Sequence, residues 1–329
     1  MKKYLFAITI FVLITGVFFE IKKMRGAQYL EQQCRVLMTT YVTVYAYGKK
    51  PAVSVAIDKA FKRMQEVTDK FNAHNAGSPL YAFNNKGIPI EDAEVLKVIK
   101  TSLDISRLSE GAFDITVYPL VKLWGFYEDK TDRVPSGDEI NQALKKVGYK
   151  HLIFTGKELR KDRDDLFIDL GGIAKGYVVG QGIEELKKSG IKSAIIQAGG
   201  DIFVLGSKGG KPWKIGIRHP RKEEGLLGYV EVEDMAVMSS GDYERFFVKG
   251  NKRYNHIINP KTGYPAAGAI GVTVIYPDPS IADAWGPTLA IMGPAGLNLV
   301  EKIPGMEAIM VTENGKIQRT RGFDKLRAL

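Results

Sequence analysis

The order of extended and helical segments is the feature that most constrains the fold of this chain. Residues 38–47, MTTYVTVYAY, alternate along the chain and therefore predict a strand. Residues 51–71 and 92–110 carry apolar side chains at helical spacing, which predicts two amphipathic helices. Later strands and helices follow without a regular strand–helix–strand rhythm. We therefore expect an α+β fold with mixed or antiparallel sheets and packed helices, rather than a doubly wound parallel sheet.

Shorter patterns predict the remaining elements. Residues 71–85 are polar and rich in turn formers, which predicts a loop, and residues 135–147 predict a helix. Another helix is expected to follow Gly171-Gly172 and end near Gly190, and a later one to open at Asp283. Short strands are predicted at residues 152–154, 166–168 and 193–196.

Composition places the chain among globular proteins with a sizeable core. Of its 329 residues, 45% are hydrophobic and 26% are charged, so a large unit can bury its apolar surface. The single cysteine, Cys34, cannot form an internal disulfide or build a thiolate metal cage alone. No repeat or low-complexity linker divides the sequence, so residues 30–329 are expected to form one unit.

Residues 1–29 predict a signal peptide or a signal anchor. An uncharged run extends from Tyr4 to Phe19, with basic residues on both sides of it. Membrane spans need about 20 apolar residues but range down to about 17, so this run is short. No clear small-residue cleavage site follows it. We therefore expect an uncleaved N-terminal hydrophobic helix, with the body exported and either membrane-anchored or periplasmic.

The charge balance bounds the kind of partner. The chain carries 47 basic and 37 acidic residues, a formal net charge of +10, which suits an anionic ligand or surface. The basic residues are mixed with acids, as in residues 184–188, EELKK, rather than gathered in tracts. We therefore expect no nucleic-acid partner, but a phosphorylated ligand or a membrane surface.

A double-glycine turn opens one predicted helix. In IDLGGIAKGY, residues 168–177, a strand ends, Gly171 and Gly172 permit a tight turn, and a helix begins. The free N–H groups of a helix N-terminus favour anions, and Lys175 adds a positive charge. The motif predicts phosphate binding. A glycine turn in a packed strand–helix junction explains the same letters about equally well when the motif is taken alone.

A second double glycine, in QAGGDI at residues 197–202, predicts a close approach of backbone to a ligand at Gly200. Asp201 could accept hydrogen bonds from a base or a ribose. The alternative is a plain hairpin turn, and the motif in isolation favours it.

Two further segments combine carboxylates with aromatic or apolar groups. In GAFDITVYPL, residues 111–120, Phe113 and Asp114 suit a heteroaromatic ring, while Trp124 and Phe126 are expected mostly in the core. In IADAWGPT, residues 281–288, Asp283 supplies the hard oxygen that Mg²⁺ prefers. The alternative for Asp283 is a helix N-cap, which stays open because Pro287 follows so soon.

The turn YNHIINPKTGYP, residues 254–265, holds one of only four histidines, His256. This histidine is either a solvated turn residue or a group fixed at the edge of a site. The motif SSGDYER, residues 239–245, precedes it.

Taken in order, these motifs resemble the ApbE family of FAD:protein FMN transferases. The resemblance runs from about Met38 to about Gly293, and it rests on the ordered set FNAHNAGSPLYAFN, GAFDITVYPLVKLWGF, IDLGGIAKGY, AGGDI, SSGDYERFF, HIINPKTGYP and ADAW. The resemblance implies an exported or anchored enzyme that uses Mg²⁺ and FAD. Such enzymes attach FMN through a phosphoester to a threonine or serine of an acceptor protein and release AMP. The implied acceptor is a subunit of a membrane redox complex.

The resemblance also implies roles for individual residues. His256 and Asp283 are implied as catalytic, and the metal is expected on Asp283, the Ala174 carbonyl and Thr288. The FAD-binding set, which joins the residues singled out above to those implied by the family, is expected to be Met38, His74, Ala112, Phe113, Asp114, Gly171, Lys175, Tyr177, Gly200, Asp201, Ser240 and His256.

Two positions depart from the family pattern. The family has a threonine four residues after the aspartate, whereas this chain has Pro287 there and Thr288 one residue later. Either Thr288 takes over as a metal ligand or the metal site is weakened. Pro79 stands where the family has an acid.

The implied reaction is phosphoryl transfer by positioning and charge neutralisation. Either His256 or a carboxylate near the metal could take the hydroxyl proton, and His256 could instead only hydrogen-bond the flavin. Two other functions fit the same site: an FAD pyrophosphatase that forms FMN and AMP, and a non-catalytic FAD-binding protein.

Overall fold

The computed structural model describes residues 29–127 and 132–327. The predicted N-terminal hydrophobic helix falls within residues 1–29 and so lies, apart from Tyr29, outside the described residues. Among the described residues, no helix combines the length and the apolar character that a membrane crossing requires.

An eight-stranded sheet forms the centre of the fold, in the order β1-β2-β5-β6-β9-β12-β13-β14. Every neighbouring pair in it is antiparallel. Its strands are β1 (Tyr29–Leu37), β2 (Thr40–Gly48), β5 (Ala194–Ala198), β6 (Asp201–Leu205), β9 (Met235–Gly241), β12 (Gly271–Tyr276), β13 (Glu307–Val311) and β14 (Ile317–Arg319). Antiparallel pairing places the β1–β2 turn, the β5–β6 turn and the end of β9 at one end of the sheet.

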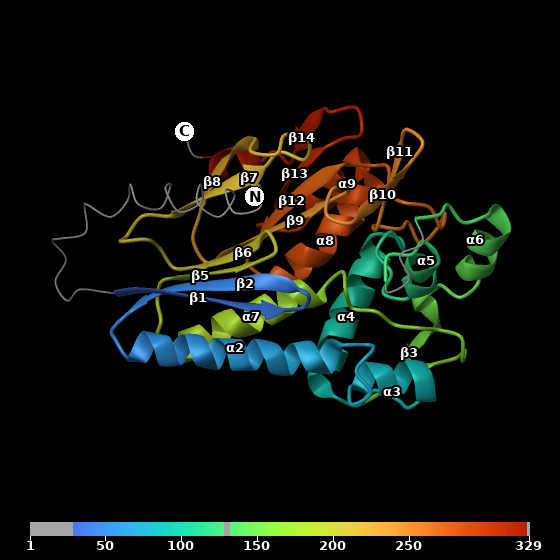
Figure 1. Cartoon of the computed structure of the whole chain (residues 1–329), viewed down its shortest axis with the longest axis horizontal. Coiled ribbons are helices and arrows are strands. Elements are labelled where there is room, and N and C mark those ends of the chain that lie inside the picture. Colours follow the sequence, from blue (N-terminus) through green and yellow to red (C-terminus); the bar gives the residue numbers. More distant parts are fainter. Residues whose placement is uncertain (1–28, 128–131, 328–329) are drawn as a thin grey trace, which may run out of the picture.

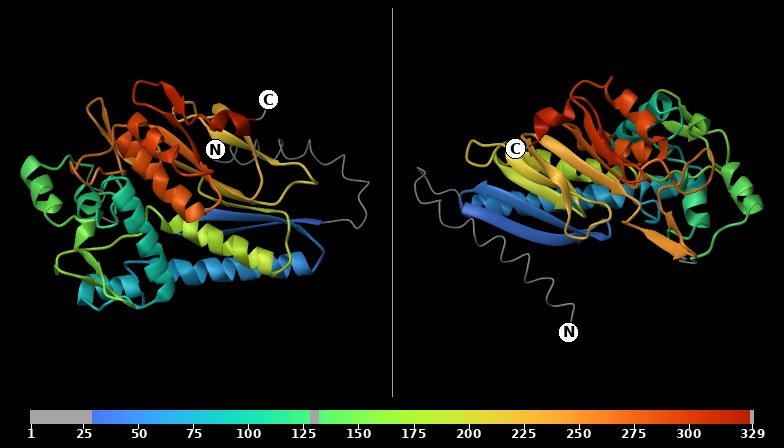
Figure 2. Two further views of the ribbon diagram at one scale, coloured as in Figure 1. Left: turned by 180° about the vertical axis from the view of Figure 1, so that it is seen from behind. Right: turned by 90° about the horizontal axis from the view of Figure 1, so that it is seen from above.

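Helices cover one face of this sheet (Figures 1 and 2). Residues of α2, α7 and α8 and the facing side chains of the strands share the largest buried cluster. Figure 1 shows β1 and β2 directly above α7 and α2. The helices are α2 (Ala52–Phe71), α3 (Pro79–Lys86), α4 (Ala93–Leu108), α5 (Tyr118–Leu123), α6 (Gly137–Leu144), α7 (Ala174–Lys188), α8 (Pro279–Met292) and α9 (Pro294–Val300), with short 3-10 turns at η1 (Tyr149–His151) and η2 (Phe323–Leu326).

The opposite face of the sheet packs on a hairpin formed by β7 (Trp213–Arg218) and β8 (Leu226–Val232). Alternating side chains of β7, such as Trp213, Ile215 and Ile217, form a second buried cluster with residues of the large sheet and Phe323. Two smaller hairpins complete the strands: β3 (Leu152–Phe154) with β4 (Leu159–Lys161), and β10 (Phe246–Lys249) with β11 (Lys252–Asn255).

A third buried cluster lies away from the large sheet and joins α5 and α6 to the β10–β11 hairpin. Trp124 is fully buried at its centre and donates its indole N–H to the carbonyl of Gly263, 2.7 Å away. In Figure 1, α5 and α6 lie at the far side of the molecule from the start of β1. The expectation that Trp124 belongs to the core is confirmed.

The α+β class with an antiparallel sheet is confirmed, and three local predictions are wrong. Residues 79–86 form α3 inside the predicted loop, capped by the hydroxyl of Ser78. Residues 166–168 form no strand, because the backbone of Ile168 pairs with the side chain of Asn84 in place of a neighbouring strand. The helix near residue 283 begins at Pro279, with Asp278 as its N-cap.

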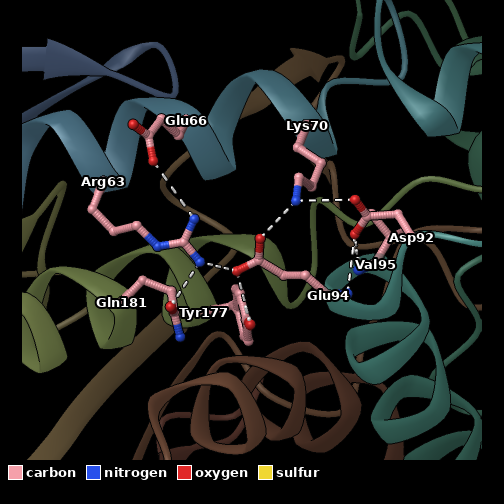
Figure 3. A network of polar contacts seen from close by, with 8 residues as sticks. All are labelled: Arg63, Glu66, Lys70, Asp92, Glu94, Val95, Tyr177 and Gln181. Atoms are coloured by element: carbon pink, nitrogen blue, oxygen red, sulfur yellow. Dashed lines mark hydrogen bonds and ion pairs between the residues drawn. The ribbon is translucent and has the colours of Figure 1, made fainter.

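An ionic network fixes α7 against α2 and α4 (Figure 3). The carboxylate of Glu94 on α4 pairs with Arg63 and Lys70 of α2 and accepts a hydrogen bond from the Tyr177 hydroxyl of α7. Lys70 also pairs with Asp92, the N-cap of α4. The side chain of Glu94 is 14% exposed, so this network is partly shielded from solvent.

Candidate active site

One pocket gathers most of the chemistry-bearing residues that the sequence motifs contain. The empty space inside it, counted out to its open mouth, is about 920 Å³. Four segments from distant parts of the chain form it, together with one face of α8. Its lining is Ala112, Phe113, Asp114, Ile115, Val117, Val121, Tyr127, Asp169, Gly171, Gly172, Lys175, Ser240, Glu244, Arg245, His256, Ile257, Ile258, Pro260, Asp283, Pro287 and Ile291.

Asp283 lies in the second turn of α8 and faces the start of α7. Because Asp278 caps the helix, the N-cap interpretation of Asp283 is wrong. Its Oδ2 accepts the Gly176 N–H at 2.7 Å, and the residue is 6% exposed. The other carboxylate oxygen, Oδ1, has no hydrogen-bond partner. Every fully buried side-chain oxygen among the described residues has a partner, so Oδ1 is accessible from the pocket that Asp283 lines.

Glycine at position 176 makes this contact possible. A Cβ there would lie 2.0 Å from the carbonyl oxygen of Pro279 and 2.7 Å from the Cβ of Asp283. The two helices therefore touch through backbone at this crossing. Burial raises the pKa of Asp283, and the charge of Lys175 opposes that rise.

The N-terminus of α7 opens toward the pocket. The turn before it closes through hydrogen bonds from the N–H groups of Ile173 and Ala174 to the carbonyl of Leu170. No side chain caps the helix at Ile173. Gly171 and Lys175 line the pocket, and Ala174 lies between the lining residues Gly172 and Lys175. Two N–H groups of its first turn are engaged, that of Ala174 by the Leu170 carbonyl and that of Gly176 by Asp283, so the helix offers a phosphate group chiefly its dipole and the charge of Lys175.

Lys175 is held by Asp201. The two side chains form an ion pair, and Asp201, 1% exposed, also accepts the Ser239 N–H at 2.8 Å. Burial alone would lower the pKa of Lys175, but Asp201 and Asp283 outweigh it and the pKa is raised. The ammonium therefore stays charged at the pocket wall.

Gly200 and Asp201 themselves do not line the pocket. Gly199 and Gly200 form the β5–β6 turn with φ values of 60° and 110°, so the hairpin interpretation of this motif is confirmed. Asp201 acts behind the pocket wall, where it orients Lys175.

Asp114 lines the pocket, but its carboxylate serves the local fold. Oδ1 accepts the N–H and hydroxyl of Thr116, and Oδ2 accepts the Tyr149 N–H. Burial raises its pKa, and these hydrogen bonds oppose the rise. Asp114 therefore shapes the segment that presents Ala112 and the ring of Phe113 to the pocket.

His256 stands at the pocket wall, half-buried, just before the turn. Its backbone N–H donates to the carbonyl of Arg245 at 3.0 Å, and its Nδ1 lies 3.3 Å from the same oxygen. A carbonyl oxygen cannot donate, so Nδ1 carries the proton and Nε2 is the acceptor. Loss of water and then the charge of Arg245 lower the pKa of His256 to about 3, so the ring is neutral at pH 7.

Besides Ala174, Gly200 and Asp201, four more predicted site residues lie outside the pocket lining. Met38 and Thr39 form the β1–β2 turn with positive φ values of 49° and 60°. The ring of His74 lies 5.8 Å from that of Tyr127, a lining residue. The Tyr177 hydroxyl bonds Glu94, as described above. The buried Thr288 hydroxyl donates to the Ala284 carbonyl at 2.6 Å, and Pro287 takes the pocket-facing position.

The pocket also contains polar residues that the sequence did not single out. The hydroxyl of Tyr127 donates to Asp169, and burial followed by the charge of Asp169 raises the pKa of Tyr127. Glu244 and Arg245 lie in the SSGDYER motif, directly after Ser240. Glu244 is an exposed residue, and partial desolvation in the pocket raises the pKa of its carboxyl to about 7. Their position in that motif was the available signal, whereas nothing in the sequence marked Tyr127.

Several known proteins resemble this chain over most of its length. The model of the ApbE family matches residues 38–310. An FAD:protein FMN transferase of Vibrio cholerae is 32% identical over 301 residues, 89% of this chain and 88% of the relative. The Escherichia coli (strain K12) protein of the same name is 33% identical, over 70% of this chain and 68% of that one.

Solved structures share the fold. The ApbE protein of Thermotoga maritima superposes with a TM-score of 0.84 at 33% identity, covering 92% of this chain and 100% of that one. The flavin transferase ApbE of Vibrio cholerae gives a TM-score of 0.82 at 31% identity, over 91% and 100% of the two chains. This chain therefore belongs to the ApbE family.

Proposed function

We propose that this protein is an FAD:protein FMN transferase that works with Mg²⁺. The observation that carries the proposal is the meeting of the α7 N-terminus, Lys175 and the open Oδ1 of Asp283 in one pocket. Such a set binds a phosphate group together with a divalent cation. The relatives named above carry the same activity in their names.

The residues present fit a magnesium ion. Asp283 offers a carboxylate oxygen with no protein donor, and the Ala174 carbonyl is the second predicted ligand from the chain. Within residues 29–127 and 132–327, no three His, Cys, Asp or Glu side chains cluster as a metal cage would need. Mg²⁺ usually takes one or two carboxylates and completes its shell with phosphate and water, which is the arrangement we propose. When bound, Mg²⁺ supplies neutralisation of the pyrophosphate charge.

The chain's own groups place FAD and the acceptor. The α7 N-terminus and Lys175 would hold the pyrophosphate, while Phe113 and Ala112 offer an apolar surface to a ring of FAD. Nε2 of neutral His256 would accept a hydrogen bond from the acceptor hydroxyl and aim its oxygen at phosphorus. Because the transition state of phosphoryl transfer is loose, this aiming matters more than strong base catalysis.

The proposed reaction forms one bond and breaks one. The oxygen of the acceptor threonine or serine bonds to the FMN-side phosphorus, and the bond from that phosphorus to the bridging oxygen breaks. AMP leaves with the bridging oxygen, and the hydroxyl proton passes to solvent. FMN is then joined to the acceptor protein by a phosphoester.

We also propose where the protein works. The uncharged run from Tyr4 to Phe19 supports an exported body, anchored in the membrane or periplasmic, with a membrane redox subunit as acceptor. Protease treatment of spheroplasts should degrade the body, and protection of the body from protease would contradict export.

Intact mass spectrometry tests the transferase activity. The full-length protein in detergent would be incubated with FAD, Mg²⁺ and a peptide that carries an acceptor threonine. We expect an FMN-sized mass gain on the peptide and stoichiometric AMP, both lost with EDTA and in Asp283→Asn. AMP without a mass gain would indicate a pyrophosphatase. Bound FAD with neither product would indicate a flavin-binding protein.

A further inference from the structure

The position beside Asp283 on α8 brings no oxygen to the pocket. Residue 287 follows Asp283 by four positions, so both lie on the same face of the helix, and both line the pocket. Residue 287 is proline, whose ring carries no donor oxygen. The nearest hydroxyl, on Thr288, is fully buried and donates to the Ala284 carbonyl, so it is directed away. A cation at Oδ1 of Asp283 would therefore take any second carboxylate or hydroxyl oxygen from another wall of the pocket.

Glu244 supplies a carboxylate at that wall. It follows β9 in the chain and lines the same pocket as Asp283 and Lys175. Among the described residues, no hydrogen bond or ion pair engages its carboxylate, whereas Asp201 and Asp114 in the same region are each engaged. Glu244 therefore brings a second carboxylate, without a protein partner among the described residues, to the pocket that Asp283 lines.

The backbone around Glu244 is built to hold it there. The neighbouring Asp242 is buried and forms a bidentate ion pair with Arg221, at 2.6 Å on each arm. The Glu244 N–H donates to the Gly241 carbonyl at 3.4 Å, and the Arg245 carbonyl accepts the His256 N–H. Hydrogen bonds thus hold the backbone of this segment on both sides of Glu244, whereas the carboxylate of Glu244 has no partner among the described residues.

We propose that Glu244 is the second carboxylate ligand of the divalent cation, beside Asp283, and that Thr288 is not a ligand. This assignment rests on the proposed function, because the cation is the one that function requires. The two carboxylates, the Ala174 carbonyl and the pyrophosphate oxygens would then hold the ion, with Lys175 left to contact phosphate.

Manganese binding tests the assignment without relying on turnover. Mn²⁺ would be titrated by electron paramagnetic resonance into the full-length protein, first alone and then with saturating FAD. We expect Glu244→Gln to weaken Mn²⁺ binding by roughly tenfold or more, as loss of a ligand-sphere group does. Thr288→Val, which keeps the shape and removes the hydroxyl, should bind Mn²⁺ like the wild type. Circular dichroism would establish that each variant is folded.

A rescue variant sharpens the test. A threonine at position 287 would place a hydroxyl on the pocket face of α8, so Pro287→Thr combined with Glu244→Gln should regain Mn²⁺ affinity. Wild-type affinity in Glu244→Gln, or a loss in Thr288→Val as large as in Glu244→Gln, would overturn the assignment. Weakened Mn²⁺ binding in Glu244→Gln and wild-type binding in Thr288→Val, together with no FMN transfer by the wild type, would refute the proposed function and leave the ligand assignment standing.

Discussion

At the scale of single residues, His256 illustrates how surroundings set a role. Its Nδ1 proton is committed to the Arg245 carbonyl, and its pKa is lowered to about 3. We therefore expect the imidazole to stay neutral from pH 5 to pH 8, with no histidine ionisation in the pH dependence of transfer. Nitrogen-15 spectra of the ring would check this, and an imidazolium signal at pH 6 would contradict it.

The same shift predicts an acid sensitivity of stability. Between the unfolded pKa of about 6.5 and the folded value of about 3, the unfolded chain binds more protons at this histidine. Its contribution to the free energy of unfolding is therefore full above pH 6.5 and falls as the pH drops toward 3. Urea unfolding at several pH values should show a flatter acid limb for His256→Gln than for the wild type.

The side chain of Asn84 makes the backbone hydrogen bonds to Ile168 that a neighbouring strand would otherwise make. It donates to the Ile168 carbonyl and accepts the Ile168 N–H, both at 2.8 Å, and it is buried. Asn84→Ala should lower the free energy of unfolding by about 1–3 kcal/mol, because two buried backbone groups lose their partners. The exposed neighbour Asn85 is the control, and Asn85→Ala should change stability by less than about 0.5 kcal/mol. Equal effects of the two substitutions in urea unfolding would contradict this role.

At the scale of elements, the crossing of α7 and α8 sets the position of the site. In Gly176→Ala the new methyl group would meet the Pro279 carbonyl and Asp283. We expect a loss of about 1–3 kcal/mol in unfolding free energy and a loss of divalent-cation binding. Gly137→Ala is the matched control, since nothing lies within 4 Å of that added Cβ. Calorimetry and Mn²⁺ titration of the two variants would distinguish a local clash from a general cost of replacing glycine.

The ionic network that joins α7 to α2 and α4 predicts that removing the Tyr177 hydroxyl lowers stability and leaves FAD binding unchanged. Tyr177→Phe removes the hydroxyl that bonds Glu94 and leaves the ring packed near Phe71. We expect a loss of about 1 kcal/mol in stability with an unchanged KM for FAD. A raised KM with unchanged stability would instead support the flavin contact that the sequence implied.

These elements also show which helices and strands could be predicted from the sequence. Periodicity predicted α2, α4 and β2, because their buried faces repeat regularly. It missed α3 and the start of α8, although Ser78-Pro79 and Asp278-Pro279 are strong helix-start signals in hindsight. Residues 166–168 defeated the pattern, since their pairing depends on a side chain 84 positions away.

The candidate site also contains residues that the sequence could predict and residues that it could not. The motifs predicted the lining residues that the chain brings in as turns, such as Gly171, Lys175 and His256. They could not predict that Asp201 serves Lys175, because only tertiary packing brings the two together. The face that Thr288 occupies became predictable only once Asp283 was known to lie inside α8, because helical spacing then places Pro287, and not Thr288, on the face of Asp283.

At the scale of the whole molecule, the three tryptophans report on three separate cores. Trp285, Trp213 and Trp124 each belong to a different buried cluster. The first two clusters share the strands of the large sheet, so we expect them to unfold together. The third rests on short helices and a hairpin and should open at lower urea concentration. Fluorescence of variants that keep one tryptophan, with phenylalanine at the other two, would check this, and a common midpoint would contradict it.

The contact between Gly176 and Asp283 makes one amide proton a built-in reporter. Whatever binds at the free oxygen of Asp283 draws electron density from the oxygen that accepts the Gly176 N–H. The chemical shift and deuterium exchange of this single amide should therefore follow occupancy of the pocket, although the glycine itself touches no ligand. A spectroscopist could read the state of the site from a backbone position that carries no side chain.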